Sequence, residues 1–190
     1  AVAVLPVMFV IFAGRATSIS ASEGTGQDRI KIWSDGFQLF KRSPVFGVGM
    51  NRYLEEVYIV AHNSFIHSYA ELGFFGGTLF TGAFYYALQS LYQIGREAVA
   101  PADSDLLRLR PFILAVVTAY VIGYMSLSRC YSVPTFLVLG LVTAYLRLVS
   151  LYSMVEAPRL NFRLVLNCIW VSCGFVIAAY LFVRAFARFG

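Results

Sequence analysis

The segment 61–77 places polar side chains that could do chemistry directly ahead of an apolar stretch. His62 carries an imidazole that can accept a proton from a hydroxyl near neutral pH, so it is a candidate general base. Asn63, His67 and Glu71 are spaced by four residues, which puts them on one face of a helix. A carboxylate inside a membrane segment costs roughly 2.5–3.5 kcal/mol on insertion scales, so we expect Glu71 to have a specific role. This polar face either supports His62 or joins neighbouring helices through hydrogen bonds.

Several arginines could bind an anionic group near this segment. Arg29 is the first candidate, because its guanidinium group stays charged and can hold two phosphate oxygens at once. Arg42 and Arg52 flank a glycine-containing turn and could extend the same site, and Arg129 lies in a short turn between two apolar runs. Each of these side chains could instead contact only solvent or lipid headgroups.

The sequence lacks patterns that mark several common classes of site. His62 and His67 are five residues apart, whereas a helical zinc pair is four apart. No Walker loop, nucleophile elbow or nucleic-acid-binding pattern occurs. We therefore predict no metal site, no cofactor and no nucleic-acid partner.

The composition places the elements around these residues in a membrane. Hydrophobic residues make up 59% of the chain and charged residues 13%, whereas soluble proteins carry about 25% charged residues. The net charge of +5 therefore fits basic residues that flank membrane helices. Four apolar runs have about the length that a helix needs to cross a bilayer, which is roughly 17–25 residues. They are 72–91, 111–127, 133–149 and 164–183.

These runs predict an all-α fold, a polytopic transmembrane helix bundle that forms a single membrane domain over 1–190. We expect about four complete helices within 66–190. Part of a fifth lies at 1–13, which is read as the end of a helix that starts before this sequence. The segment 14–65 is then an external loop that contains the candidate site.

The external loop is expected to contain its own helix. Ile30, Trp33 and Phe37 recur at helical spacing, which predicts an amphipathic helix over 28–41 that ends before Pro44. We expect this helix to lie along the membrane surface, with Trp33 at the depth of the lipid headgroups.

The distribution of basic residues predicts the orientation of the chain. The connections at 95–110 and 147–163 carry several arginines each, whereas the short turn on the other side carries only Arg129. By the positive-inside rule the first two connections are cytoplasmic, and 14–65 faces the periplasm or the outside. Arg184, at the outer end of the last apolar run, counts against this orientation.

Three sequence motifs occur in a fixed order along the chain. They are Asp28-Arg29-Ile30-Lys31-Ile32-Trp33, then Pro44-Val45-Phe46-Gly47-Val48-Gly49, and then His62-Asn63 followed by Glu71-Leu72-Gly73-Phe74-Phe75-Gly76. In this order they resemble the signature of the O-antigen ligase / O-antigen polymerase superfamily, which are membrane glycosyltransferases of the bacterial cell envelope. Ligase and polymerase share these motifs, so the resemblance leaves the choice between them open.

The resemblance implies an enzyme of the bacterial inner membrane that acts on the periplasmic face. It would transfer a glycan from undecaprenyl pyrophosphate to an acceptor hydroxyl by a metal-independent, inverting displacement. The acceptor would be lipid A core, another lipid-linked glycan or a protein. Arg29 is implied to bind the pyrophosphate and His62 to serve as the base, with Glu71 as a further family-matched residue.

A second class of protein also explains polar residues in a membrane. In a non-enzymatic transporter of polysaccharide or ions, Arg29, Glu71 and Arg129 would line a polar path and His62 would sense pH. Polar groups gathered in one pocket at the outer rim would favour transfer chemistry, whereas a file of them through the bilayer would favour transport.

Overall fold

The computed structural model describes residues 25–97, 104–152 and 161–187, and every regular element within them is a helix. The predicted all-α fold is therefore confirmed, and the expected helix end at 1–13 lies outside the described residues. The elements are α2 (Thr25–Arg42), α3 (Arg52–Val57), α4 (Ser64–Glu97), α5 (Ser104–Tyr124), α6 (Val133–Tyr152) and α7 (Phe162–Phe186).

Three helices in the described part of the chain are long and apolar enough to cross a membrane. They are Asp105–Tyr124, Val133–Tyr152 and Phe162–Phe186, which match the last three of the predicted runs. The remaining predicted run is the first along the chain, 72–91. It lies within α4, which is not among these three helices.

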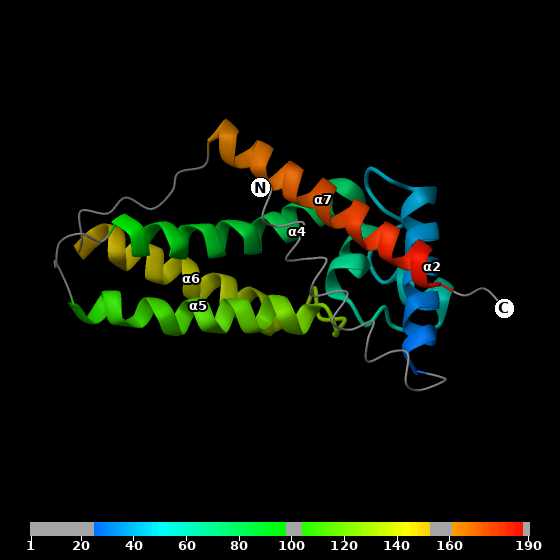
Figure 1. Ribbon diagram of the computed structural model, residues 1–190, viewed down its shortest axis with the longest axis horizontal. Helices are drawn as coiled ribbons and strands as arrows, with labels where there is room; N and C mark the ends of the chain where they lie inside the picture. Colours follow the sequence, from blue (N-terminus) through cyan, green and yellow to red (C-terminus); the bar gives the residue numbers. More distant parts are fainter. Residues whose placement is uncertain (1–24, 98–103, 153–160, 188–190) are drawn as a thin grey trace.

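Helix α4 is the central element of the bundle. It packs against α2, α5, α6 and α7, while α5 and α6 lie side by side and α7 runs obliquely from the middle of the bundle to α2 (Figure 1). Aromatic rings fill the junction: the ring of Phe65 on α4 lies 6.4 Å from Tyr124 on α5 and 5.4 Å from Phe175 on α7. This aromatic core fixes the start of α4 against the two neighbouring helices.

Helix α2 lies crosswise at one end of the bundle (Figure 1). Its apolar face is buried against α7, where Trp33 lies 6.2 Å from Phe182 and Phe37 lies 5.6 Å from Tyr180 between ring centroids. The predicted amphipathic helix is thus confirmed, and the Trp33 side chain on its apolar face is only 3% exposed. The apolar stripe packs on protein.

The glycine-containing turn and the break in α4 interlock through their backbones. Gly73 interrupts the helix with φ 67° and ψ −167°, which leaves nearby peptide groups without helical partners. The turn supplies those partners: Val48 and Gly49 N–H donate to the Ala70 and Glu71 carbonyls, and Phe74 and Phe75 N–H donate to the Pro44 and Val45 carbonyls, at 2.7–3.1 Å. The second and third sequence motifs are therefore one structural unit.

Candidate functional site

The backbone of His62 is fixed on both sides. The Trp33 indole N–H donates to the Ala61 carbonyl over 2.7 Å, which attaches this segment to α2. On the other side, the Asn63 side-chain oxygen accepts the Phe65 and Ile66 N–H groups over 3.0 and 3.1 Å. His62 itself adopts φ 50°, in the left-handed region that non-glycine residues rarely occupy. Strain of this kind is concentrated at functional sites.

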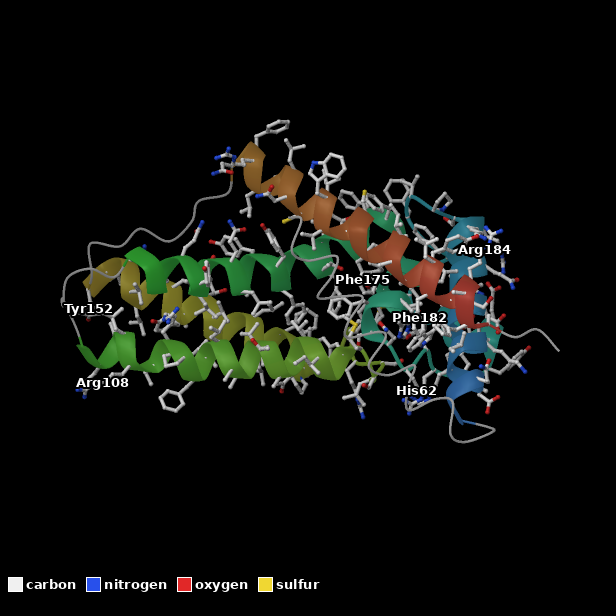
Figure 2. All side chains as sticks on the ribbon, viewed as in Figure 1. His62, Arg108, Tyr152, Phe175, Phe182 and Arg184 are labelled. Carbon is white, nitrogen blue, oxygen red and sulfur yellow. The ribbon has the colours of Figure 1, made fainter. Side chains whose placement is uncertain are left out.

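His62 lies at the end of the molecule that α2 crosses. Figure 2 shows it there, whereas Arg108 and Tyr152 lie at the opposite end of the bundle. Arg184, at the end of α7, is on the same side as His62, as expected from the sequence. The side chain of His62 is partly buried, so part of its surface remains exposed.

Asn63 is the cap of α4. Its side-chain oxygen satisfies two N–H groups of the first helical turn, as an N-cap side chain does. The residue is 0% exposed, so its side chain belongs to the interior beneath His62.

His67 and Glu71 form a buried ion pair one turn further along α4. The His67 Nε2 atom lies 3.1 Å from Glu71 Oε1, and the same oxygen accepts the Tyr53 N–H over 3.0 Å. The Tyr53 hydroxyl in turn donates to the Ile32 carbonyl on α2 over 2.6 Å. Glu71 is 0% exposed, so it connects α2, α3 and α4 from the inside.

The pKa values of this pair move in opposite directions. Burial lowers the pKa of His67, but its contacts with Cys130 and Glu71 outweigh burial and raise the pKa to about 9. Burial alone would raise the pKa of Glu71, yet the hydrogen bond and charge of His67 and the Tyr53 N–H lower it overall. Both partners are therefore charged near neutral pH, as expected for a buried pair of opposite charges.

The turn between α5 and α6 docks beside the start of α4. The Ser64 hydroxyl donates to the Leu127 carbonyl and accepts the Arg129 N–H over 2.9 Å. Tyr131, in the same turn, has its ring 5.8 Å from the His67 imidazole. The structure thus brings the backbone of Arg129 to the residue that follows the His62-Asn63 pair, although these segments are far apart in the sequence.

The four candidate arginines do not form one cluster. Arg29 lies on the exposed side of α2, one helical turn before Trp33, which bonds to the residue next to His62. Arg42 lies 13 residues further along α2, about 20 Å away along the helix axis, and pairs with Glu56. Arg52 pairs with Glu55 over 3.0 Å at the surface. Arg29 lies one turn from Trp33, which bonds to Ala61, and the Arg129 N–H bonds to Ser64, so both belong to segments that contact the residues around His62.

The sequence did not reveal every residue that builds this end of the molecule. Tyr53 contributes a backbone N–H to Glu71, and a backbone group has no signature in the sequence. Tyr131 and Cys130 approach His67 from a distant turn. The spacing of His67 and Glu71 did indicate that they share one face of a helix. The structure shows that this face of α4 contacts α3, which in turn bonds to α2.

Metal donors do not gather in the described part of the chain. Within residues 25–97, 104–152 and 161–187, no group of three or more His, Cys, Asp or Glu side chains could hold an ion. The sequence 103–105 has an Asp-x-Asp spacing, but its second member, Asp105, pairs with Arg108 at the end opposite His62.

The first part of the chain is similar to a known protein family. Residues 1–81 match the family model described as O-antigen ligase. Over these residues the chain is similar to O-antigen ligases, and the match covers less than half of the 190 residues. The O-antigen ligase match contains all three motifs and ends inside α4, so α5, α6 and α7 lie beyond it. No curated protein and no solved structure matches the chain.

The O-antigen ligase match and the apolar helices together define the class of this protein. Three apolar helices indicate a multi-pass membrane protein, and its first 81 residues are similar to O-antigen ligases.

Proposed function

We propose that this protein moves a glycan from undecaprenyl pyrophosphate to an acceptor hydroxyl at the end of the bundle where His62 lies. The observation that carries the proposal is the meeting of α2, the His62 segment and the α5–α6 turn at that end, through the Trp33–Ala61 and Ser64–Arg129 hydrogen bonds. In the proposed orientation this end faces the periplasmic side of the bacterial inner membrane. The acceptor is lipid A core, a lipid-linked glycan or a protein hydroxyl.

In this proposal His62 takes the proton from the acceptor hydroxyl as its oxygen attacks the anomeric carbon. Arg29 holds the pyrophosphate that leaves, because a guanidinium can neutralise two of its oxygens without a metal ion. Direct displacement inverts the configuration at the anomeric carbon.

The remaining candidates take supporting positions. Asn63 and Glu71 fix the segment around His62 from the interior, since both are 0% exposed. Arg42 and Arg52 belong to surface ion pairs of the loop, so we assign neither to the reacting groups.

The distribution of charge supports transfer rather than transport. Among the buried residues that the structure describes, Glu71 is the only charged one, and it lies two turns from the start of α4 near His62. A file of buried charges along the bundle would favour a transport path. Among the described residues, Asn63, Ser64, Ser68 and Glu71 are buried polar residues at or near the start of α4, whereas the buried polar residues elsewhere carry no charge: Thr81, Ser90, Thr135 and Ser172.

The test is a transfer assay with the full protein in liposomes. These are supplied with a lipid-pyrophosphate glycan and candidate acceptors in EDTA. We expect an acceptor-linked product in wild type, and a rate roughly 10- to 100-fold lower in Arg29→Ala, because charge-assisted hydrogen bonds contribute roughly 1.5–3 kcal/mol. Lys31→Ala is the matched control, since it removes an exposed cation from the same helix.

Two outcomes would contradict the proposal. One is movement of the glycan across the bilayer without any acceptor-linked product, which would support the transporter. The other is transfer by Arg29→Ala at the rate of Lys31→Ala, which would remove Arg29 from the site.

A further inference from the structure

A groove lies between the outer ends of α5 and α6, beyond the residues that match the family. Its volume is about 390 Å³. The lining is mostly apolar, with one charged residue among its members, which include Tyr120, Gly123, Leu127, Arg129, Ser132 and Pro134.

The groove has room for a hydrocarbon chain at Gly123. A Cβ atom built on this glycine would meet no atom within 4 Å, so the helix surface is open there. Among the lining residues, Leu127 is an apolar side chain that is 49% exposed. Because Gly123 and Pro134 belong to two candidate membrane spans, we expect the groove to open toward lipid.

Arg129 adds a fixed positive charge to the groove. Its carbonyl accepts the Ser132 and Thr135 hydroxyls over 2.8 and 2.7 Å, and its N–H donates to Ser64, so the backbone is held from three sides. The side chain is exposed, and within the described residues no carboxylate forms an ion pair with it. This guanidinium is therefore free to pair with an anion from outside the chain.

We propose that the groove binds one anionic phospholipid of the surrounding leaflet. Its phosphate pairs with Arg129, and one of its acyl chains lies along Gly123. A single cation in the lining matches a single phosphodiester in charge, whereas a pyrophosphate would leave negative charge without a partner. The sequence placed Arg129 among the residues for the glycan donor, and the groove gives it a different ligand.

The test uses the full protein in nanodiscs that contain a photoactivatable phosphatidylglycerol, with the labelled peptides mapped by mass spectrometry. Gly123→Leu fills the groove, and Arg129→Gln removes its charge. Gly140→Leu is the matched control, because Gly140 lies on α6, also has open space around it and is not part of the lining. Size-exclusion profiles and circular dichroism show that each variant is folded.

We expect labelling of the α5–α6 region in wild type and Gly140→Leu, and about fivefold less in Arg129→Gln, since one basic residue near an anionic surface contributes about 1 kcal/mol. Gly123→Leu should lose labelling to a similar or greater extent. Equal labelling of Gly123→Leu and Gly140→Leu would overturn the proposal, as would equal labelling by photoactivatable phosphatidylcholine. Displacement by undecaprenyl pyrophosphate but not by unlabelled phosphatidylglycerol would also overturn it, in favour of the glycan donor.

Discussion

The spacing of four residues between His67 and Glu71 lets the two side chains form an ion pair inside the protein. A carboxylate with no exposed surface requires a partner, and Glu71 has His67 on its own helix and the Tyr53 N–H on α3. Removing one member of a buried pair typically costs about 3–5 kcal/mol, because the other charge stays buried without compensation. The pair therefore makes the connection between α3 and α4 dependent on the charge of an imidazole.

This dependence predicts a pH effect on stability. His67 lies in the part of α4 that precedes the break at Gly73, and its pKa is raised in the fold from 6.5 to about 9. The folded state thus binds a proton more tightly than the unfolded state, so the stabilisation is complete below 6.5 and is lost as the pH rises through about 9. We expect the apparent unfolding temperature in detergent to fall over this interval, and His67→Gln to show a smaller fall. The same decrease in both proteins would contradict the assignment.

At the scale of elements, the turn over 44–49 and the break in α4 depend on each other. A Cβ atom on Gly47 would overlap the backbone of Glu71, and one on Gly73 would overlap the backbone of Val45 and Gly47. Both glycines also adopt positive φ, at 74° and 67°. These glycines are therefore required by close backbone approach, and the motif they define positions the first part of α4.

A substitution at the break tests this interlock. We expect Gly73→Ala to lower the apparent unfolding temperature, because left-handed strain costs about 1–3 kcal/mol and the turn must also move away. Gly140→Ala is the control: this glycine is helical with open space around its Cβ position, so the change should be close to neutral. Thermal unfolding of both variants in the same detergent measures the difference. Equal stability of the two variants would show that the turn does not need this close contact.

At the scale of the whole molecule, the sequence predicts the elements better than their partners. Apolar runs and helical spacing located α2, α6 and α7 within a few residues, whereas α5 begins at Ser104, well before the predicted run at 111–127. The apolar stripe of α2 does not say which surface covers it, and only the structure shows that Trp33 is buried by protein. Likewise a positive charge does not reveal its partner: Arg42 pairs with Glu56, and Arg129 meets α4 only because the α5–α6 turn folds back.

The proposed function of the whole molecule depends on His62 as the base of the glycan transfer. Its position depends on contacts from α2 and from the α4 cap, which hold it in the left-handed region. A suitable variant must keep this backbone conformation while removing the imidazole. Asparagine does so, because it is enriched at positive φ. Tyr58 is a matched control site, since it also has positive φ, at 61°, and is 84% exposed in the same segment.

The most direct measurement is the single-turnover rate of glycan transfer by His62→Asn and Tyr58→Asn in proteoliposomes. A positioned general base contributes about 10²–10⁴ in rate, so His62→Asn should be slower than wild type by that factor. Tyr58→Asn should retain a rate close to wild type. If His62→Asn transfers the glycan as fast as Tyr58→Asn does, His62 is not the base and the proposed site is wrong.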